Sequence, residues 1–215
     1  MNSTSPAEEP NIPVDLAESL PQQANTPMWA YRCKKLILRQ TPKRVHLPDK
    51  DRLLTMLPHG LTKALCSLTR GEAPWPLFLH GPPGVGKTCI GLLLLDFAGG
   101  FYHTASTLAE DVILAGKGQL YYEGSHHAVS QKALWKAFRE TALVVLDEVG
   151  SRSKVADWHY ECTKRLLDER EVRPLVVISN LDLDQIAQVY DDRVASRLAA
   201  GTVLACQGED LRLKR

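Results

Sequence analysis

The sequence has no apolar run long enough to cross a membrane. Its longest run, from Cys89 to Leu95, ends at Asp96, whereas a membrane-spanning helix needs about 20 apolar residues. The chain also has almost no net charge, because 26 Lys and Arg residues stand against 25 Asp and Glu residues. No whole-chain field therefore attracts nucleic acid or a lipid surface, and any such attraction must come from a local patch.

Cysteine is scarce, and the five cysteines are scattered and odd in number. They form no C-x-x-C pair, so neither a disulfide framework nor a zinc site is indicated. A signal peptide is also missing, because four acidic residues precede the first basic residue, Arg32. These absences favour a reduced, cytoplasmic location.

What is present is an ordinary globular composition, with 44% hydrophobic and 24% charged residues. Such fractions exclude a wholly disordered, collagen-like or coiled-coil protein. At about 150 residues per domain, the 215 residues predict one compact domain with an appendage.

The chain divides into three predicted segments. Residues 1–27 contain five prolines, four acids and no Lys or Arg, which predicts a disordered, acidic leader. Residues 28–70 form a basic N-terminal arm, with eight Lys and Arg against two Asp between positions 28 and 56. This arm is either a phosphate- or partner-binding segment or a solvated helix face, and the sequence leaves both open. Residues 71–215 form the folded core.

Short apolar runs alternate with helical stretches in this core, as in a parallel sheet with crossover helices. The predicted class is α/β, with a parallel five-stranded sheet flanked by helices. Helices are expected at Cys89–Ala98 and Val155–Arg170, the second because apolar residues recur there every three or four positions. The predicted strands are Pro76–His80, Phe101–Ala105, Leu143–Leu146, Leu175–Ser179 and Thr202–Cys206.

The strongest motif is G-P-P-G-V-G-K-T, which follows the first predicted strand and opens a predicted helix. In this P-loop pattern the glycines let backbone N–H groups surround phosphate oxygens, and the helix N-terminus adds positive potential. We expect Lys87 to neutralise the β and γ phosphates of ATP, and the Thr88 hydroxyl to bind Mg²⁺. The predicted nucleotide-binding residues are Gly81, Pro82, Pro83, Gly84, Val85, Gly86, Lys87, Thr88 and Cys89.

Two carboxylates, Asp147 and Glu148, follow the apolar strand Leu143–Leu146. Ligands of open α/β sheets bind at the carboxyl edge of the strands, so Asp147 is expected to bind the metal beside Thr88. Glu148 is then expected to orient and polarise the attacking water molecule. Because hydrolysis needs such a residue and transfer to a bound hydroxyl does not, the pair favours an ATPase over a small-molecule kinase.

Polar residues also mark two later elements. Asn180 ends the apolar strand Leu175–Ser179, and its amide is expected to contact the water or the γ-phosphate as a sensor. Arg193 and Arg197 lie four residues apart, on one face of a short predicted helix. They are either a salt-bridged surface or the source of an arginine finger that enters a neighbouring subunit's ATP site.

These motifs resemble, in their order, those of AAA+ ATPases of the bacterial helicase-loader type (DnaC-like) and of their relatives, the transposition helpers (IstB-like). The resemblance spans about residues 41–215. It implies an AAA+ core without a full lid domain, because little chain follows the last predicted strand. The matching runs are G-P-P-G-V-G-K-T, L-V-V-L-D-E, V-I-S-N-L, D-R-V-A-S-R-L and G-E-D-L-R.

Carried over to this chain, the resemblance implies ATP and Mg²⁺ as cofactors and hydrolysis of ATP to ADP and phosphate. It implies that Arg197 is the trans-acting finger, with Arg193 beside it, so that the active form is a homo-oligomer. Arg212 matches the last arginine of the family's G-x-S-x-R ending only loosely, because Asp210 stands where a serine is usual.

The resemblance further implies that the protein loads or remodels a replicative helicase on single-stranded DNA. In this clade an extra helix before the Asp-Glu strand often contacts DNA, and aromatic and basic side chains suit such binding. Core packing is the alternative for each residue concerned. The candidates in this interval are Lys117, Tyr121, Tyr122, His126, His127, Lys132, Trp135, Lys136 and Arg139.

Three other functions remain open. An ATP-dependent helper of a transposase uses the same motor residues. A nucleotide-gated protein-binding module with little turnover has no need of Glu148. A monomeric P-loop kinase needs an arginine-bearing lid and a substrate pocket, and neither is evident in the sequence. No membrane partner is expected for any of them.

Overall fold

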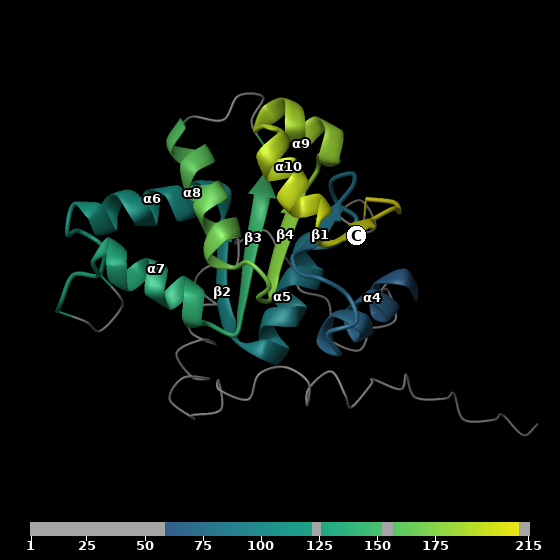
Figure 1. Cartoon of the computed structure of the whole chain (residues 1–215), viewed down its shortest axis with the longest axis horizontal. Coiled ribbons are helices and arrows are strands. Elements are labelled where there is room, and N and C mark those ends of the chain that lie inside the picture. The colour runs from purple at the N-terminus through teal and green to yellow at the C-terminus, as the bar shows by residue number, and fades with distance from the viewer. Residues whose placement is uncertain (1–58, 122–125, 152–156, 211–215) are drawn as a thin grey trace, which may run out of the picture.

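A computed structural model describes residues 59–121, 126–151 and 157–210. Its centre is a parallel five-stranded sheet in the order β2-β3-β4-β1-β5, with helices on both faces (Figure 1). The predicted fold class is thereby confirmed, and each predicted strand is present with ends shifted by at most three residues. The strands are β1 Leu77–His80, β2 Gly100–Thr104, β3 Leu143–Val149, β4 Leu175–Ser179 and β5 Thr202–Ala205.

Helices connect these strands. The two predicted helices are found as α5 and α8, and the short helix expected to carry Arg193 and Arg197 is α10. The predicted leader, and the arm as far as residue 58, lie outside the described residues. The helices are α4 His59–Thr69, α5 Lys87–Ala98, α6 Ala105–Gly116, α7 Gln131–Glu140, α8 Asp157–Glu169, α9 Leu183–Val189 and α10 Asp192–Ala199.

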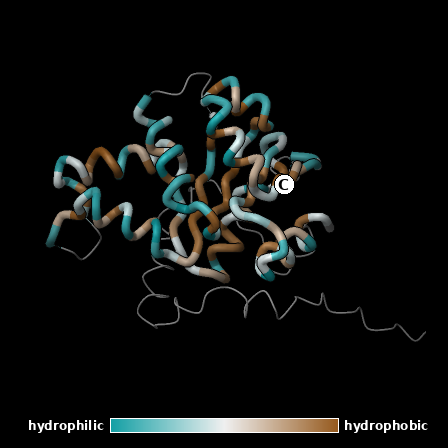
Figure 2. Tube along the Cα trace, viewed as in Figure 1, coloured by the Kyte–Doolittle hydropathy of each residue, from teal (hydrophilic) through white to brown (hydrophobic). Residues whose placement is uncertain are grey.

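Two apolar clusters cover the two faces of the sheet. On β3, Val145 belongs to the cluster that includes α4 and α5, whereas its neighbours Val144 and Leu146 belong to the cluster that includes α6, α7, α8 and α10. This alternation follows from the two-residue period of a strand. Because both faces are covered, the strands are mostly apolar, with polar residues chiefly toward their carboxyl ends, and Figure 2 shows the apolar residues gathered in the sheet. Asp147 has the parity of Val145 and therefore belongs to the α5 face.

Helix α5 lies unusually close to the sheet at Gly91. A Cβ atom at this position would lie 2.9 Å from Cγ1 of Val145 and 3.0 Å from Cδ1 of Ile178. A glycine within a helix normally costs about 1 kcal/mol relative to alanine. Here it lets the helix that begins with the P-loop lysine pack directly on β3 and β4.

Helix α4 falls within the segment predicted as a basic arm, and its apolar face packs on the core. Leu61, Leu65 and Leu68 are buried in the same cluster as Leu77 and Leu79 of β1. The helix therefore fastens the chain before the P-loop strand to the α5 face of the sheet. No helix among the described residues is long and apolar enough to span a bilayer.

Arg170, just after α8, is buried and joins two connections. Its guanidinium donates to the carbonyls of Phe138, Thr141 and Pro174, among others. Burial lowers the pKa of this side chain to about 10. One arginine thus connects the chain between α7 and β3 to the turn before β4, and so links the segments that lead into these two neighbouring strands.

Candidate nucleotide-binding site

The P-loop lies between β1 and α5, at the carboxyl edge of the sheet. Gly86 is the N-cap residue of α5 and has φ 91°, a conformation that glycine adopts without strain. Lys87 is buried, and its Nζ atom donates to the carbonyls of Gly81 at 2.6 Å and Pro82 at 2.7 Å. The Lys87 side chain therefore folds back toward the start of the P-loop. Its ammonium group lies beside the loop backbone, which in this motif binds phosphate.

Thr88 and Asp147 meet although 59 residues separate them in the sequence. The Thr88 hydroxyl donates to Oδ2 of Asp147 at 2.7 Å. This contact follows from the parity of β3, which turns Asp147 toward α5, and from the close packing of α5 at Gly91. The sequence predicts that these two side chains lie side by side, and the structure brings them together.

An irregularity in β3 separates the two carboxylates. Leu146 pairs with Val177 and Val149 pairs with Ser179, so Asp147 and Glu148 together oppose the single residue Ile178. Glu148 has φ 57°, a left-handed conformation that is uncommon for residues other than glycine. As a result Asp147 is buried and Glu148 is exposed, with the Glu148 N–H donating to Oδ1 of Asp147 at 2.7 Å.

Asn180 follows β4, the strand between β1 and β3. Because Ser179 pairs with His80 of β1 and with Val149 of β3, Asn180 stands at the level where the P-loop begins. Ser179 secures this end of the sheet: its hydroxyl donates to the Val149 carbonyl at 2.6 Å and accepts the Leu181 N–H at 2.9 Å. Asn180 itself is exposed at the edge.

Tyr102 is a residue of this site that none of the predicted motifs contains. It lies on β2, is buried, and donates its hydroxyl to Oδ2 of Asp147 at 2.9 Å. Burial, and then the nearby charge of Asp147, raise the pKa of Tyr102. A tyrosine within an apolar strand is a usable signal, because a buried phenol needs a hydrogen-bond partner.

The chain after β5 lies against the P-loop (Figure 1). A Cβ atom on Gly81 would lie 2.1 Å from the Cys206 carbonyl oxygen, and one on Gly84 would lie 2.0 Å from Oδ1 of Asp210. The Asp210 carboxylate therefore rests on the α-carbon of a P-loop glycine. Arg212, whose role the sequence left open, lies outside the described residues.

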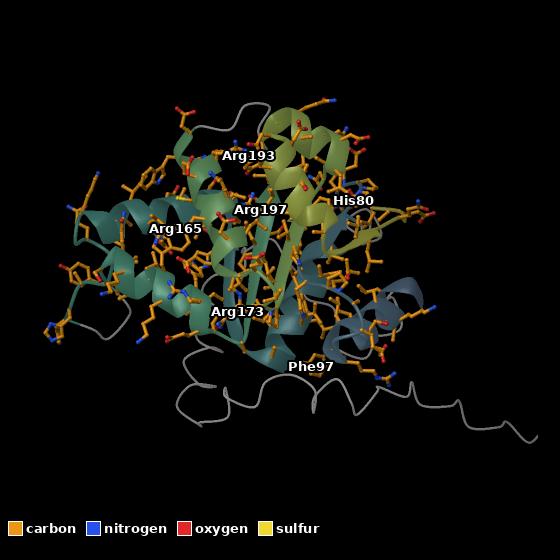
Figure 3. The ribbon with its side chains drawn as sticks, viewed as in Figure 1. His80, Phe97, Arg165, Arg173, Arg193 and Arg197 are labelled. Atoms are coloured by element: carbon orange, nitrogen blue, oxygen red, sulfur yellow. The ribbon has the colours of Figure 1, made fainter. Side chains whose placement is uncertain are left out.

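Arg193 and Arg197 lie on α10 beside α8, as Figure 3 shows. The Nε atom of Arg197 is 2.6 Å from Oδ1 of Asp168 on α8. Arg193 is exposed near Asp191, the N-cap residue of α10. The structure therefore places Asp147 and the P-loop together, and places these two arginines on another element.

The donors at this point suit magnesium. Thr88 and Asp147 offer oxygen ligands, and Mg²⁺ is commonly bound by one or two carboxylates together with substrate phosphates and water. Within the described ranges no group of three or more His, Cys, Asp and Glu side chains is arranged to hold a metal ion.

Cys89, the last predicted P-loop residue, is half-buried, and burial raises the pKa of its thiol.

The candidate DNA contacts separate by exposure. Trp135 is buried, with Arg165 stacked over its ring at 4.4 Å, so it is a core residue. Tyr122 lies outside the described residues. The exposed candidates on and between α6 and α7 are Lys117, Tyr121, His126, His127, Lys132, Lys136 and Arg139.

Comparison with known proteins identifies the fold. No protein-family model and no curated protein matches the chain. Among solved structures, the DnaC helicase loader is similar over 80% of this chain and 98% of its own, with 17% identity and a TM-score of 0.55. The chain therefore shares the fold of the DnaC helicase loader.

Two DnaA structures share the fold. AMPPCP-bound DnaA from Aquifex aeolicus matches 74% of this chain with 19% identity and a TM-score of 0.53. Replication initiator DnaA bound to AMPPCP and single-stranded DNA matches 81% of it with 16% identity and a TM-score of 0.56. The chain spans about half of each, 50% and 53% respectively.

Proposed function

We propose that this chain is an ATP-hydrolysing AAA+ protein that loads or remodels a replicative helicase on single-stranded DNA. The observation that carries the proposal is the hydrogen bond from Thr88 to Asp147, which joins the P-loop to the acidic end of β3. Residues suited to phosphate and residues suited to metal thereby meet at one point of the sheet edge. The fold shared with the DnaC loader and with DnaA supports a role in replication.

Each site residue has a distinct role in this proposal. Lys87 neutralises phosphate charge, and Thr88 and Asp147 hold Mg²⁺, which stabilises the negative charge on the phosphates when it is bound. Glu148, exposed beside them, orients the attacking water molecule. Asn180, at the carboxyl edge between β1 and β3, senses the γ-phosphate.

The trans-acting role of Arg197 makes assembly part of the proposal. Within the described residues Arg197 pairs with Asp168, and that contact lies on the α8–α10 side of the domain. We infer that Arg197, with Arg193 one turn before it, enters the nucleotide site of a second copy. Hydrolysis then requires a homo-oligomer.

Single-stranded DNA is the proposed nucleic-acid partner. Tyr121 is 56% exposed, and Lys117 and Lys132 are exposed on the same α6–α7 region. This region extends beyond the edge of the sheet at β2 (Figure 1). An exposed aromatic ring with nearby cations suits binding to bases and backbone without sequence preference.

The first test is ATP turnover as a function of protein concentration, with and without single-stranded DNA. We expect specific activity to rise with both, because a trans-acting arginine couples hydrolysis to assembly. Lys87→Ala should abolish nucleotide binding, and Lys63→Ala, which removes an exposed lysine of α4, should leave it unchanged. Activity independent of both concentration and DNA would exclude the trans-acting arginine and favour a self-contained site.

The DNA and protein partners need separate tests. Fluorescence anisotropy with a labelled oligo(dT) should show binding that weakens in the double variant Tyr121→Ala/Lys132→Ala. Pull-down with a purified replicative helicase, against a purified transposase as the alternative, then tests the protein partner. Retention of the transposase alone would replace helicase loading by a helper role in transposition.

A further inference from the structure

The carboxylate of Asp147 accepts hydrogen bonds from three different segments of the chain. Oδ2 accepts the hydroxyls of Thr88 at 2.7 Å and Tyr102 at 2.9 Å. Oδ1 accepts the backbone N–H of Glu148 at 2.7 Å. Thr88 belongs to the P-loop motif and Glu148 to the Asp147-Glu148 pair, whereas Tyr102 comes from β2 and belongs to neither.

Tyr102 reaches Asp147 from within the apolar core. It is 2% exposed and its ring packs in the apolar cluster on the α5 face. A phenylalanine would fill nearly the same volume in that cluster. Compared with phenylalanine, Tyr102 adds a hydroxyl group, which donates to Oδ2 of Asp147, the same oxygen that accepts the Thr88 hydroxyl.

A second donor on Oδ2 has a physical consequence. Rotation about the bond from Cβ to the carboxylate of an aspartate is soft, with broad minima. If the Thr88 oxygen becomes a metal ligand and its hydrogen bond to Oδ2 is lost, the Glu148 N–H still holds Oδ1, but Oδ2 depends on Tyr102 for its position. A hydroxyl held rigidly by the core keeps Oδ2 directed toward the P-loop.

We propose that Tyr102 is a positioning residue that holds the Asp147 carboxylate in the orientation that binds the divalent cation of the nucleotide site. This inference rests on the proposed function, because it takes Asp147 and Thr88 as metal ligands. It assigns a role to β2, one of the two edge strands, which carries neither the P-loop motif nor the Asp-Glu motif.

The test measures metal affinity directly in the full chain. Mn²⁺ is titrated into protein saturated with AMPPCP, and free Mn²⁺ is followed by electron paramagnetic resonance. We expect Tyr102→Phe to weaken Mn²⁺ binding by about 10-fold, as loss of a group that supports a metal ligand does elsewhere. AMPPCP affinity measured in EDTA should change by less than about twofold, because the substitution leaves the P-loop residues in place.

The matched control is Tyr160→Phe. Tyr160 donates its hydroxyl to Oδ2 of Asp191 at 2.6 Å, so the variant deletes the same kind of hydrogen bond away from the site. It should leave Mn²⁺ affinity unchanged. If Tyr102→Phe does not fold, as judged by circular dichroism, Tyr102→Met removes the hydroxyl with a side chain that adapts to the cluster.

The outcomes separate this inference from the proposed function. Equal Mn²⁺ affinity in the wild type and Tyr102→Phe overturns the role of Tyr102 and leaves the nucleotide site intact. A wild-type chain that binds AMPPCP but takes up no Mn²⁺ overturns the metal assignment and this inference with it. A wild-type chain that binds neither overturns the proposed function itself.

Discussion

Arg197 and Asp168 form an ion pair between α10 and α8, with Nε 2.6 Å from Oδ1. The two side chains are 40% and 45% exposed. Ion pairs this exposed contribute about 1 kcal/mol or less to the free energy of unfolding. The pair is therefore weak enough to be broken, as the proposed entry of Arg197 into the nucleotide site of a second copy requires.

This relationship predicts the effect of Arg197→Ala. The variant should bind ATP as the wild type does, lose the concentration-dependent part of ATP turnover, and lose less than about 1 kcal/mol of unfolding free energy. Arg165→Ala on α8 removes the same charge from a side chain that is 51% exposed, and its turnover should stay concentration-dependent. Unchanged turnover in Arg197→Ala would remove this arginine from the proposed catalytic residues.

Asp210 predicts an electrostatic effect on nucleotide binding. Its carboxylate rests on Gly84 of the P-loop, where it lowers the positive potential available to phosphates. Asp210→Asn should tighten ATP binding by roughly 1 kcal/mol, or about fivefold, at low salt. Glu209→Gln removes the neighbouring charge and is the control. Isothermal titration at two salt concentrations checks the result, because screening should reduce the difference.

Glu148 combines a proposed role in hydrolysis with an unfavourable backbone conformation. Its φ is 57°, and Val172, with φ 56°, shares the left-handed conformation on an exposed turn. Asparagine tolerates this conformation well, so Glu148→Asn and Val172→Asn should each raise the free energy of unfolding by roughly 1 kcal/mol. Only Glu148→Asn should abolish ATP turnover. Denaturant unfolding and a turnover assay on both variants test the prediction.

Arg170 predicts a large loss of stability. The buried guanidinium satisfies carbonyls of Phe138, Thr141 and Pro174, and each buried acceptor left without a partner costs about 1–3 kcal/mol. Arg170→Met should therefore lower the free energy of unfolding by roughly 3 kcal/mol or more. Arg173→Met removes an exposed side chain that donates to the Arg139 carbonyl at 2.8 Å, and should cost far less. Equal losses of unfolding free energy in Arg170→Met and Arg173→Met, measured by urea unfolding, would contradict the stabilising role of the buried Arg170 hydrogen bonds.

Much of the fold was predictable from local pattern. Strands buried on both faces appear as continuous apolar runs, and the P-loop motif identifies both the strand before it and the helix after it. The irregularity at Asp147 and Glu148 was not predictable, because it depends on how β3 pairs with β4. That pairing leaves Glu148 exposed next to a buried Asp147.

The sequence by itself determined the α/β class, the P-loop and the succession of polar strand ends at Asp147 and Asn180, because these features depend on residues close together in the chain. Only the tertiary structure decided which distant groups meet: Tyr102 with Asp147, Asp210 with Gly84, and Arg197 with Asp168. Those contacts depend on strand order and register and on how the helices pack. Both are set by the burial of the whole core rather than by any local pattern.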